Sequence, residues 1–228
     1  MSTSIWNMSA SNSEPRRKDW NAIYESEVLT RRRRSGHLAK LRKAGFFDIP
    51  RHSRILDLGC GTGEMLDILA EEGFDDLTGM DRYQPSGHSS KRWCHVQGSV
   101  ERLPFGAEKF DAILCAHALH HISWEVKIDT FFAEAARCLK PGGTFFLIDH
   151  YDSLHLRAAL WVLRSPLAQL HSWSAAFREQ IRAEHRELYR YLDRWGGLAK
   201  KLRDMNFEEK KMRKDLFFFY FSGKKASR

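Results

Sequence analysis

The sequence predicts an α/β fold in which a seven-stranded, mostly parallel β-sheet carries helices on both faces. Short apolar segments alternate with amphipathic helical segments between residues 54 and 150, which is typical of parallel strands joined by crossover helices. A helical stretch at about 151–206 then interrupts the alternation as an insertion. Two strand-like segments, 207–214 and 216–222, meet at Asp215, and they predict an antiparallel hairpin at the end of the sheet.

Length and composition fit one domain with a disordered start. The chain has 228 residues, of which 43% are hydrophobic, enough for a substantial core. Residues 1–14 are rich in serine and asparagine and are predicted to be disordered. Residues 15–228 are predicted to form a single domain, beginning with a charged helical segment over about 16–44 in which Leu38 and Leu41 face the core.

The first part of the sheet is predicted from three apolar segments. A buried strand spans 54–58, and a helix follows it from Glu64 to a stop at Gly73. A second short strand covers 77–80 and ends at Asp81. A third strand covers 93–97.

The most apolar segment, 110–115, predicts the fourth strand. A helix over 128–139 follows it, with its aromatic and aliphatic residues on one stripe. The residues 140–143 (KPGG) are predicted to end that helix, because proline and glycine cannot continue it. A fifth strand is predicted over 144–149.

The insertion is predicted to contain three helical pieces that form a lid over the substrate end of the sheet. The first runs from 151 to about 172 and is broken at Pro166. Ser174 is predicted to cap the second helix, which Gly196 and Gly197 end. A short third helix, 198–205, leads into the hairpin.

The glycine-rich turn after the first strand carries the strongest chemical signal. Gly59, Gly61 and Gly63 separate the strand from the helix that begins at Glu64. A turn without side chains lets a ligand approach the backbone, and the first N–H groups of a helix lack helical partners. Such turns also occur without a ligand, so the turn alone is a weak indication.

Two acidic residues make the signal specific. Asp81 follows Gly63 by 18 residues at the end of the next predicted strand, where an acid is suited to bind a ribose diol. Asp57 precedes Gly59 by two residues, and an acid there suits a ligand with an amino group and repels a diphosphate. The pattern favours a nucleoside with an amino-acid tail over a dinucleotide.

Five segments stand in a characteristic order: 55–64 (ILDLGCGTGE), 78–81 (TGMD), 98–105 (GSVERLPF), 110–122 (FDAILCAHALHHI) and 139–149 (LKPGGTFFLID). In this order they resemble the class I S-adenosylmethionine (SAM)-dependent methyltransferases, close to the small-molecule group of ubiquinone- and menaquinone-biosynthesis C-methyltransferases. The resemblance implies a Rossmann-like fold, SAM as cofactor, and methyl transfer by in-line displacement in a cleft that excludes water.

The resemblance also implies a role for each matching position. The residues implied for cofactor binding are Asp57, Gly59, Gly61, Gly63, Asp81, Arg82, Ser99, Val100 and Ala116. The turn and Asp57 would meet the methionine part, Asp81 the ribose hydroxyls, and the segment around Ser99 the adenine. The family often has aspartate where this chain has Ser99, so the Val100 N–H is a further candidate for the adenine edge.

His117 and His120, after the fourth strand, are the candidate catalytic residues. A neutral imidazole titrates near pH ~6.5 and suits a general base. A metal site at these histidines is the alternative, but no second cluster of carboxylates or cysteines accompanies them, so no metal is predicted. The four cysteines lie far apart and contain no CxxC pair, which is typical of reduced thiols. No signal-peptide pattern is present at the start, and a cytoplasmic protein is expected.

The charge distribution leaves the methyl acceptor open. Residues 1–54 carry a net charge of +7, residues 55–150 carry −7, and residues 151–228 carry +8. We predict a small-molecule acceptor held under the lid. The basic flanks alternatively favour an anionic carrier protein or a lipid surface. A third interpretation, an RNA-modifying or RNA-binding protein, would use Arg31–Arg34 and the arginines spaced four apart from Arg178 to Arg194 to contact phosphates.

Overall fold

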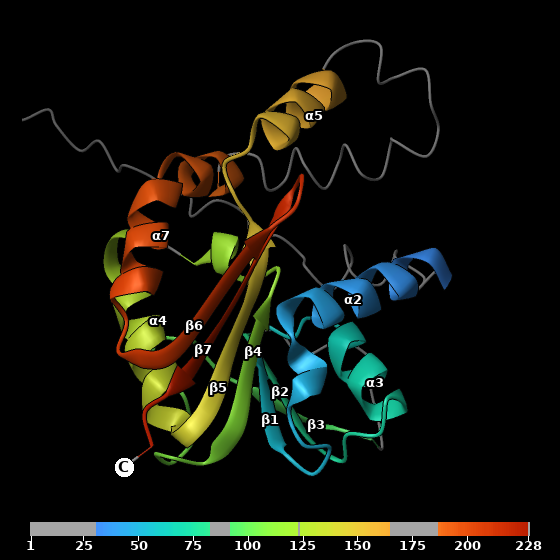
Figure 1. Ribbon diagram of the computed structural model, residues 1–228, viewed down its shortest axis with the longest axis vertical. Helices are drawn as coiled ribbons and strands as arrows, with labels where there is room; N and C mark the ends of the chain where they lie inside the picture. Colours follow the sequence, from blue (N-terminus) through green and yellow to red (C-terminus); the bar gives the residue numbers. More distant parts are fainter. Residues whose placement is uncertain (1–30, 83–91, 123, 165–186, 228) are drawn as a thin grey trace, which may run out of the picture.

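The computed structural model describes residues 31–82, 92–122, 124–164 and 187–227 (Figure 1). The predicted disorder of 1–14, the first half of the segment 16–44, the break at Pro166 and the cap at Ser174 lie outside these residues. Within the insertion 151–206, the described residues 154–164, 187–193 and 195–204 are helical.

A seven-stranded sheet forms the centre of the molecule, in the order β3-β2-β1-β4-β5-β7-β6. Its strands are β1 (Arg54–Leu58), β2 (Asp76–Asp81), β3 (Cys94–Gln97), β4 (Phe110–Ala116), β5 (Leu139–His150), β6 (Phe207–Lys214) and β7 (Phe218–Lys225). The first five strands are parallel to one another, and β7 pairs antiparallel with both β5 and β6. The predicted mixed sheet with a C-terminal antiparallel hairpin is confirmed.

Helices cover both faces of the sheet (Figure 1). The helices α2 (Arg31–Ala44) and α3 (Glu64–Glu71) lie on one face, and α4 (Trp124–Cys138) and α7 (Trp195–Asp204) lie on the other. The helix α5 (Leu154–Arg164) extends beyond the carboxyl end of β5, and residues 187–193 are also helical. Short 3₁₀ turns at Phe46–Asp48 and Leu119–His121 complete the described helical elements.

The side chains of β5 show how the two layers are built. Phe145 and Leu147 join the apolar cluster under α4 and α7, whereas Phe146 and Ile148 join the cluster under α2 and α3. This alternation follows from the two-residue period of a strand, and both faces are apolar because both are covered. Leu41 of α2 is fully buried in the second cluster, as predicted.

The segment 140–143 departs from the prediction. The helix α4 ends at Cys138, but the KPGG residues belong to an irregular start of β5. Leu139 pairs with Phe110 and Thr144 pairs with Ala112, so the register shifts between these pairs. The turn signal correctly predicted the end of the helix, and residues 140–143 form an irregular segment of β5 between two residues that do pair with β4.

The glycines at 196 and 197 also behave differently from the prediction. Both lie in the first turn of α7, and the chain breaks earlier, at the turn residue Arg194. At the hairpin, β7 begins at Phe218, two residues later than predicted, because the Asp215 carboxylate accepts the N–H groups of Phe217 and Phe218 and holds them in the turn. Each helix within the described residues is too short or too polar to cross a bilayer.

Candidate active site

The glycine turn lies at the carboxyl edge of the sheet, between β1 and α3. Gly59, Gly61 and Gly63 have φ angles of 75°, 53° and 82°, a backbone region that favours glycine. A Cβ on Gly59 would lie 2.4 Å from the Cβ of Ala118, and one on Gly63 would lie 2.0 Å from the Trp93 ring. The chain therefore requires glycine at both positions for its own packing, and the tight turn leaves the backbone uncovered by Cβ atoms.

Two carboxylates flank this turn. Asp57, on β1, is only 2% exposed, and its Oδ1 has no hydrogen-bond partner within the described part of the chain. Burial, and then the negative charge of Asp81, raise the pKa of Asp57 from 3.8 to about 8. Asp81, at the end of β2, accepts a hydrogen bond from the Gly61 N–H at 2.9 Å. A cation bound beside this pair would favour the ionised form of Asp57.

The residues predicted to surround the adenine follow β2 and β3 at the same edge. The Arg82 side chain is 61% exposed and lies 3.8 Å from the Glu101 carboxylate. The Ser99 hydroxyl donates to that carboxylate at 3.3 Å and accepts the Glu101 N–H. Val100 packs partly buried against the core. The Ser99 hydroxyl is thus engaged by a neighbouring side chain.

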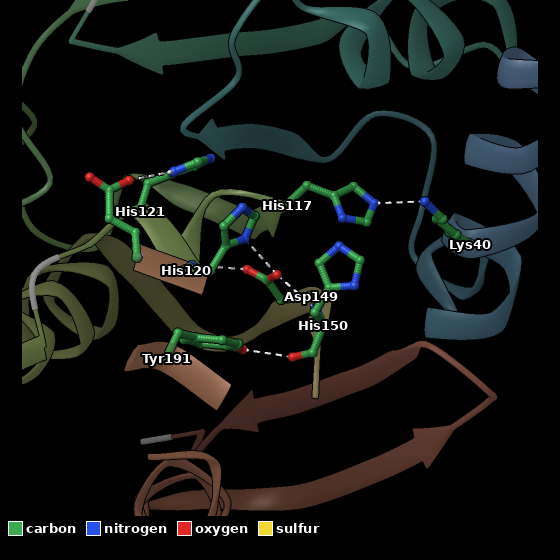
Figure 2. Close-up of polar contacts among 8 residues, drawn as sticks. Lys40, His117, His120, His121, Asp149, His150 and Tyr191 are labelled. Atoms are coloured by element: carbon green, nitrogen blue, oxygen red, sulfur yellow. Dashed lines mark hydrogen bonds and ion pairs between the residues drawn. The ribbon is translucent and has the colours of Figure 1, made fainter. Parts of the chain in front are cut away.

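His117, just after Ala116 at the end of β4, is held in an unusual conformation. Its φ is 57°, and its N–H donates to the carbonyl of Ile148 on β5 at 2.8 Å. The Lys40 Nζ on α2 lies 2.9 Å from the His117 Nε2 (Figure 2). Burial, and then the charge of Lys40, hold the pKa of His117 well below its ordinary value. His117 is therefore a neutral imidazole whose Nε2 accepts a hydrogen bond from the Lys40 ammonium group.

His120 is bound to a buried carboxylate instead. Its Nδ1 lies 2.8 Å from Oδ1 of Asp149, at the end of β5, and its N–H donates to Oδ2 at 3.2 Å (Figure 2). Asp149 is fully buried. Burial alone would raise the pKa of Asp149, but the charge and hydrogen bond of His120 lower it below its ordinary value. Because an ionised carboxylate only accepts, the His120 Nδ1 carries the proton.

The end of the insertion packs against these histidines. The Tyr191 hydroxyl donates to the His150 carbonyl at 2.9 Å, and its ring centroid lies 6.1 Å from that of His120. Glu187 reaches His121, with 3.5 Å between Oε2 and Nδ1. On the opposite side, α2 contributes Lys40. Elements far apart in the sequence thus meet around one histidine cluster, which consists of His117, His120, His121 and His150.

Sequence reasoning missed three residues of this cluster: Lys40, Asp149 and Tyr191. Asp149 carried a usable signal, because it ends the strand next to the one that the histidine segment follows. Carboxyl ends of adjacent parallel strands lie side by side, so Asp149 and His120 were candidates for contact. Lys40 and Tyr191 lie in helical segments. The local sequence pattern predicts that these segments are helical, but it does not predict where they pack on the sheet.

The described residues contain no group of three histidine, cysteine or acidic side chains arranged to hold a metal ion. The basic segments are only partly described: Arg178, Arg182 and Arg186 fall outside the described ranges, and Arg34 forms an ion pair with Glu71.

A polar groove of about 770 Å³ lies at the amino edge of the sheet, opposite the glycine turn. Its lining includes Lys43, Arg54, Asp76, Asp111, Lys140 and Lys211. Arg54 pairs with Asp76 and Lys140 pairs with Asp111. None of the predicted site residues lines this groove. We place the candidate active site at the carboxyl edge, because the turn, the acidic pair and the histidines all converge there.

Comparison with known proteins finds methyltransferases among the relatives of this chain. Residues 56–147 match the methyltransferase domain family Methyltransf_11. The chain is 34% identical over 119 residues to an uncharacterised methyltransferase of Synechocystis, a match that covers 50% of this chain and 53% of that protein. It is 36% identical over 95 residues to a demethylmenaquinone methyltransferase of Tropheryma whipplei, covering 39% and 38%. The chain spans about half the length or less of these curated relatives.

Among solved structures, a SAM-dependent methyltransferase from Methanococcus maripaludis, itself described as putative, superposes with a TM-score of 0.57 at 16% identity, covering 84% of this chain and 85% of that one. This likeness shows the fold. The predicted Rossmann-like fold and the predicted resemblance to SAM-dependent methyltransferases are confirmed, and the matched residues 56–147 correspond to a methyltransferase domain.

Proposed function

We propose that this protein transfers a methyl group from SAM to a small-molecule acceptor at the carboxyl edge of its sheet. One observation carries the proposal: a buried Asp57 oxygen without a partner among the described residues stands beside the glycine turn and Asp81. Buried polar atoms without partners are rare in folded proteins. A ligand with a positive charge and a ribose would satisfy both carboxylates.

The residues present fit SAM. Asp57 would face the positively charged part of SAM. Asp81 would accept hydrogen bonds from the ribose hydroxyls and would still accept the hydrogen bond from the Gly61 N–H. Arg82 and the segment around Val100 would border the adenine. When bound, SAM supplies a methyl group on a positively charged sulfur, which any well-aligned nucleophile attacks in line.

The two candidate catalytic histidines are suited to different tasks. In His117, the Nε2 atom accepts from Lys40, so the atom that would take a proton is already occupied. In His120, Nδ1 lies 2.8 Å from the buried Asp149 carboxylate, which would stabilise the imidazolium that forms when a histidine takes up a proton. We therefore assign the role of general base to His120, and we assign to His117 and Lys40 the role of lining the methyl-transfer edge.

The insertion is suited to cover the acceptor. Tyr191 packs against the His120 ring and anchors residues 187–193 to the end of β5. His120 is only 6% exposed. A covered site excludes water, which strengthens electrostatic interactions and prevents hydrolysis of the reacting groups. The lid-like role predicted for the segment 151–206 is part of this proposal.

A small-molecule acceptor is supported by the Tropheryma whipplei relative, whose name states a demethylmenaquinone substrate. The acceptor of the present chain is tested by incubating the protein with methyl-labelled SAM and two preparations, a metabolite extract and total RNA. We expect label in the small-molecule fraction. Label in RNA alone would contradict the acceptor class, and failure to bind SAM in calorimetry would contradict the whole proposal.

A further inference from the structure

The groove at the amino edge of the sheet is lined by more basic than acidic side chains. Six lysine or arginine residues and three aspartates line it. Lys43, Arg54 and Lys140 each form an ion pair with an aspartate. The other three basic residues belong to the C-terminal hairpin of β6 and β7, and they are Lys211, Arg213 and Lys224. The hairpin therefore brings additional positive charge to the groove.

Lys211 and Arg213, on β6, carry charges that the described part of the chain does not neutralise. Both side chains are exposed, and neither makes a hydrogen bond or ion pair with another described residue. Two of the three lining aspartates are already paired with Arg54 and Lys140. The third, Asp48, belongs to the 3₁₀ turn after α2, and one carboxylate cannot offset two positive charges.

The strand register places these basic side chains on one face of the sheet. Lys211 lies opposite Ser222, and Arg213 lies opposite Tyr220, whose ring joins the apolar cluster under α2 and α3. Because side chains alternate along a strand, both basic groups lie on the α2 face. Lys224, two residues beyond Ser222, is the diagonal neighbour of Lys211 on the same face. Like charges this close repel one another, and a bound anion would relieve the repulsion.

Two hydroxyl groups add donors to the same groove. Thr144, on β5, lies opposite Lys224, and Ser222 lies between β5 and Lys211. Both residues line the groove, and neither hydroxyl makes a hydrogen bond with another described residue. A guanidinium group, an ammonium group and hydroxyls together match the several acceptor oxygens of a phosphate group.

The shape of the groove favours a small ligand. Its volume of about 770 Å³ lies within the roughly 300–1,000 Å³ that is typical of small-molecule sites. The segment after α2, the irregular start of β5 and the terminal hairpin bound it on different sides. Nucleic acids are instead held along an extended track of phosphate contacts. The groove is therefore better suited to a compact anion than to an RNA strand.

We propose that this groove binds a small molecule that carries a phosphate or diphosphate group, with Lys211 and Arg213 as its main contacts. The hydroxyls of Thr144 and Ser222 supply further donors. The groove lies at the opposite edge of the sheet from the glycine turn, so this site is separate from the proposed methyl-transfer site and does not depend on it.

A structural role for the same charges is the alternative that the experiment must exclude. The strand β6 is an edge strand of the sheet. Charged side chains on an edge strand prevent it from pairing with a strand of another molecule. This role requires no ligand, and it predicts that loss of Lys211 and Arg213 changes the association state of the protein.

The first test is titration calorimetry of the full-length protein with pyrophosphate at low ionic strength. Pyrophosphate lacks a nucleoside, and the acidic pair Asp57 and Asp81 would repel it, so it does not report on the glycine turn. Citrate serves as a comparison anion that carries carboxylates. We expect saturable binding of pyrophosphate at one site and weaker binding of citrate. No saturable binding of pyrophosphate, or binding of citrate that is as tight, would overturn the inference.

The second test changes the charges of the groove. The double variant Lys211→Gln/Arg213→Gln should weaken pyrophosphate binding at least about tenfold, since each hydrogen bond to a charged group contributes about 10–150-fold. The control Lys200→Gln/Arg203→Gln removes the same charge from exposed positions on α7, which covers the opposite face (Figure 1). The control should bind pyrophosphate within about twofold of the unaltered protein.

Each remaining outcome overturns the inference in a different way. Equal weakening in the two double variants would show that pyrophosphate responds only to net charge. Unchanged affinity in the groove variant, with new dimers in sedimentation velocity, would assign the charges to edge protection. A short single-stranded RNA that binds more tightly than pyrophosphate, and loses affinity in the groove variant, would replace the small molecule with nucleic acid.

Two further measurements keep the test independent of folding and of the proposed function. Circular dichroism checks both double variants. If the groove variant does not fold, the comparison of pyrophosphate with citrate on the unaltered protein decides. SAM binding is measured in parallel, and its absence would contradict the proposed function while leaving the anion site intact.

Discussion

The two edges of the sheet place the same residue type in opposite surroundings. At the amino edge, Asp76 and Asp111 are partly exposed and pair with Arg54 and Lys140. At the carboxyl edge, Asp57 and Asp149 are buried, and neither pairs with a lysine or arginine within the part of the chain that the structure describes. The amino edge neutralises its carboxylates with basic side chains of the chain itself, whereas the carboxyl edge leaves one oxygen of Asp57 without a partner among the described residues. We expect ligand binding at the carboxyl edge, because buried ionisable groups with shifted pKa values are typical of functional sites.

The largest expected difference between the edges is in the pH dependence of stability. The pKa of Asp57 rises from 3.8 to about 8 on folding, so its protonated form favours the folded state. Without ligand, this contribution is complete below about pH 4 and is lost as the pH rises to about 8, at up to ~1.4 kcal/mol per pH unit. The free energy of unfolding of Asp57→Asn, from urea titrations, should lack this loss.

The matched comparison for that prediction is Asp111→Asn at the amino edge. Lys140 and the Arg54 N–H lower the pKa of Asp111 despite partial burial. The ionised form of Asp111 therefore stabilises the folded state, the reverse of Asp57. This stabilisation is lost as the pH falls below the ordinary pKa of an aspartate. Parallel pH profiles for Asp57→Asn and the unaltered protein would show that the carboxyl edge is no different from the amino edge.

The second prediction compares the two ends of β2. Asp81→Ala should weaken SAM binding about 10–150-fold, because hydrogen bonds to a charged group contribute ~1.5–3 kcal/mol. Asp76→Ala, at the other end of the strand, removes an exposed pairing with Arg54 and should leave the SAM dissociation constant unchanged. Calorimetry on both variants, with folding checked by circular dichroism, measures this difference. Equal affinities would remove Asp81 from the cofactor site.

A smaller effect is expected where the insertion meets the carboxyl edge. Tyr191→Phe removes the hydrogen bond to the His150 carbonyl and should cost about 1 kcal/mol of stability. It should also lower methyl transfer more than SAM affinity, because the tyrosine faces His120 and lies away from the glycine turn. Tyr220→Phe, which removes a bond to Asp215 near the hairpin turn, is the control for stability alone. A loss of SAM affinity equal to the loss of turnover would contradict the covering role.

The smallest effect is expected from the amino-edge ion pairs. Lys140→Met removes the partner of Asp111, and partly exposed pairs of this kind contribute about 0–1 kcal/mol. Thermal unfolding should therefore change little, and SAM binding should not change. A large loss of either would mean that the groove at this edge takes part in function.

The sequence predicted the carboxyl edge better than the histidine cluster, and the reason is physical. The glycine turn, Asp57 and Asp81 are related by short spacings that a strand, a turn and a helix translate directly into proximity. The contacts of His120 with Asp149, of His117 with Lys40 and of His150 with Tyr191 join residues 29, 77 and 41 positions apart. Such contacts depend on how helices dock, which local patterns do not specify.

The two errors in the fold have a similar origin. The residues 140–143 carry strong turn signals, yet they lie inside β5, because Leu139 and Thr144 on either side of them pair with β4. Gly196 and Gly197 are poor helix formers, yet the packing of Leu198 and Leu202 against the core holds α7 around them. Tertiary packing outweighed local propensity in both places, and neither error touched the candidate site.

The most direct test of the carboxyl-edge assignment is the proton count on SAM binding. Titration calorimetry at pH 7, in two buffers of different ionisation enthalpy, reports how many protons binding releases. Because Asp57 is largely protonated without ligand, a cation bound beside it should release up to one proton, and Asp57→Asn should abolish that release. SAM binding with no proton release, or with the same release in Asp57→Asn, would contradict the placement of SAM beside Asp57.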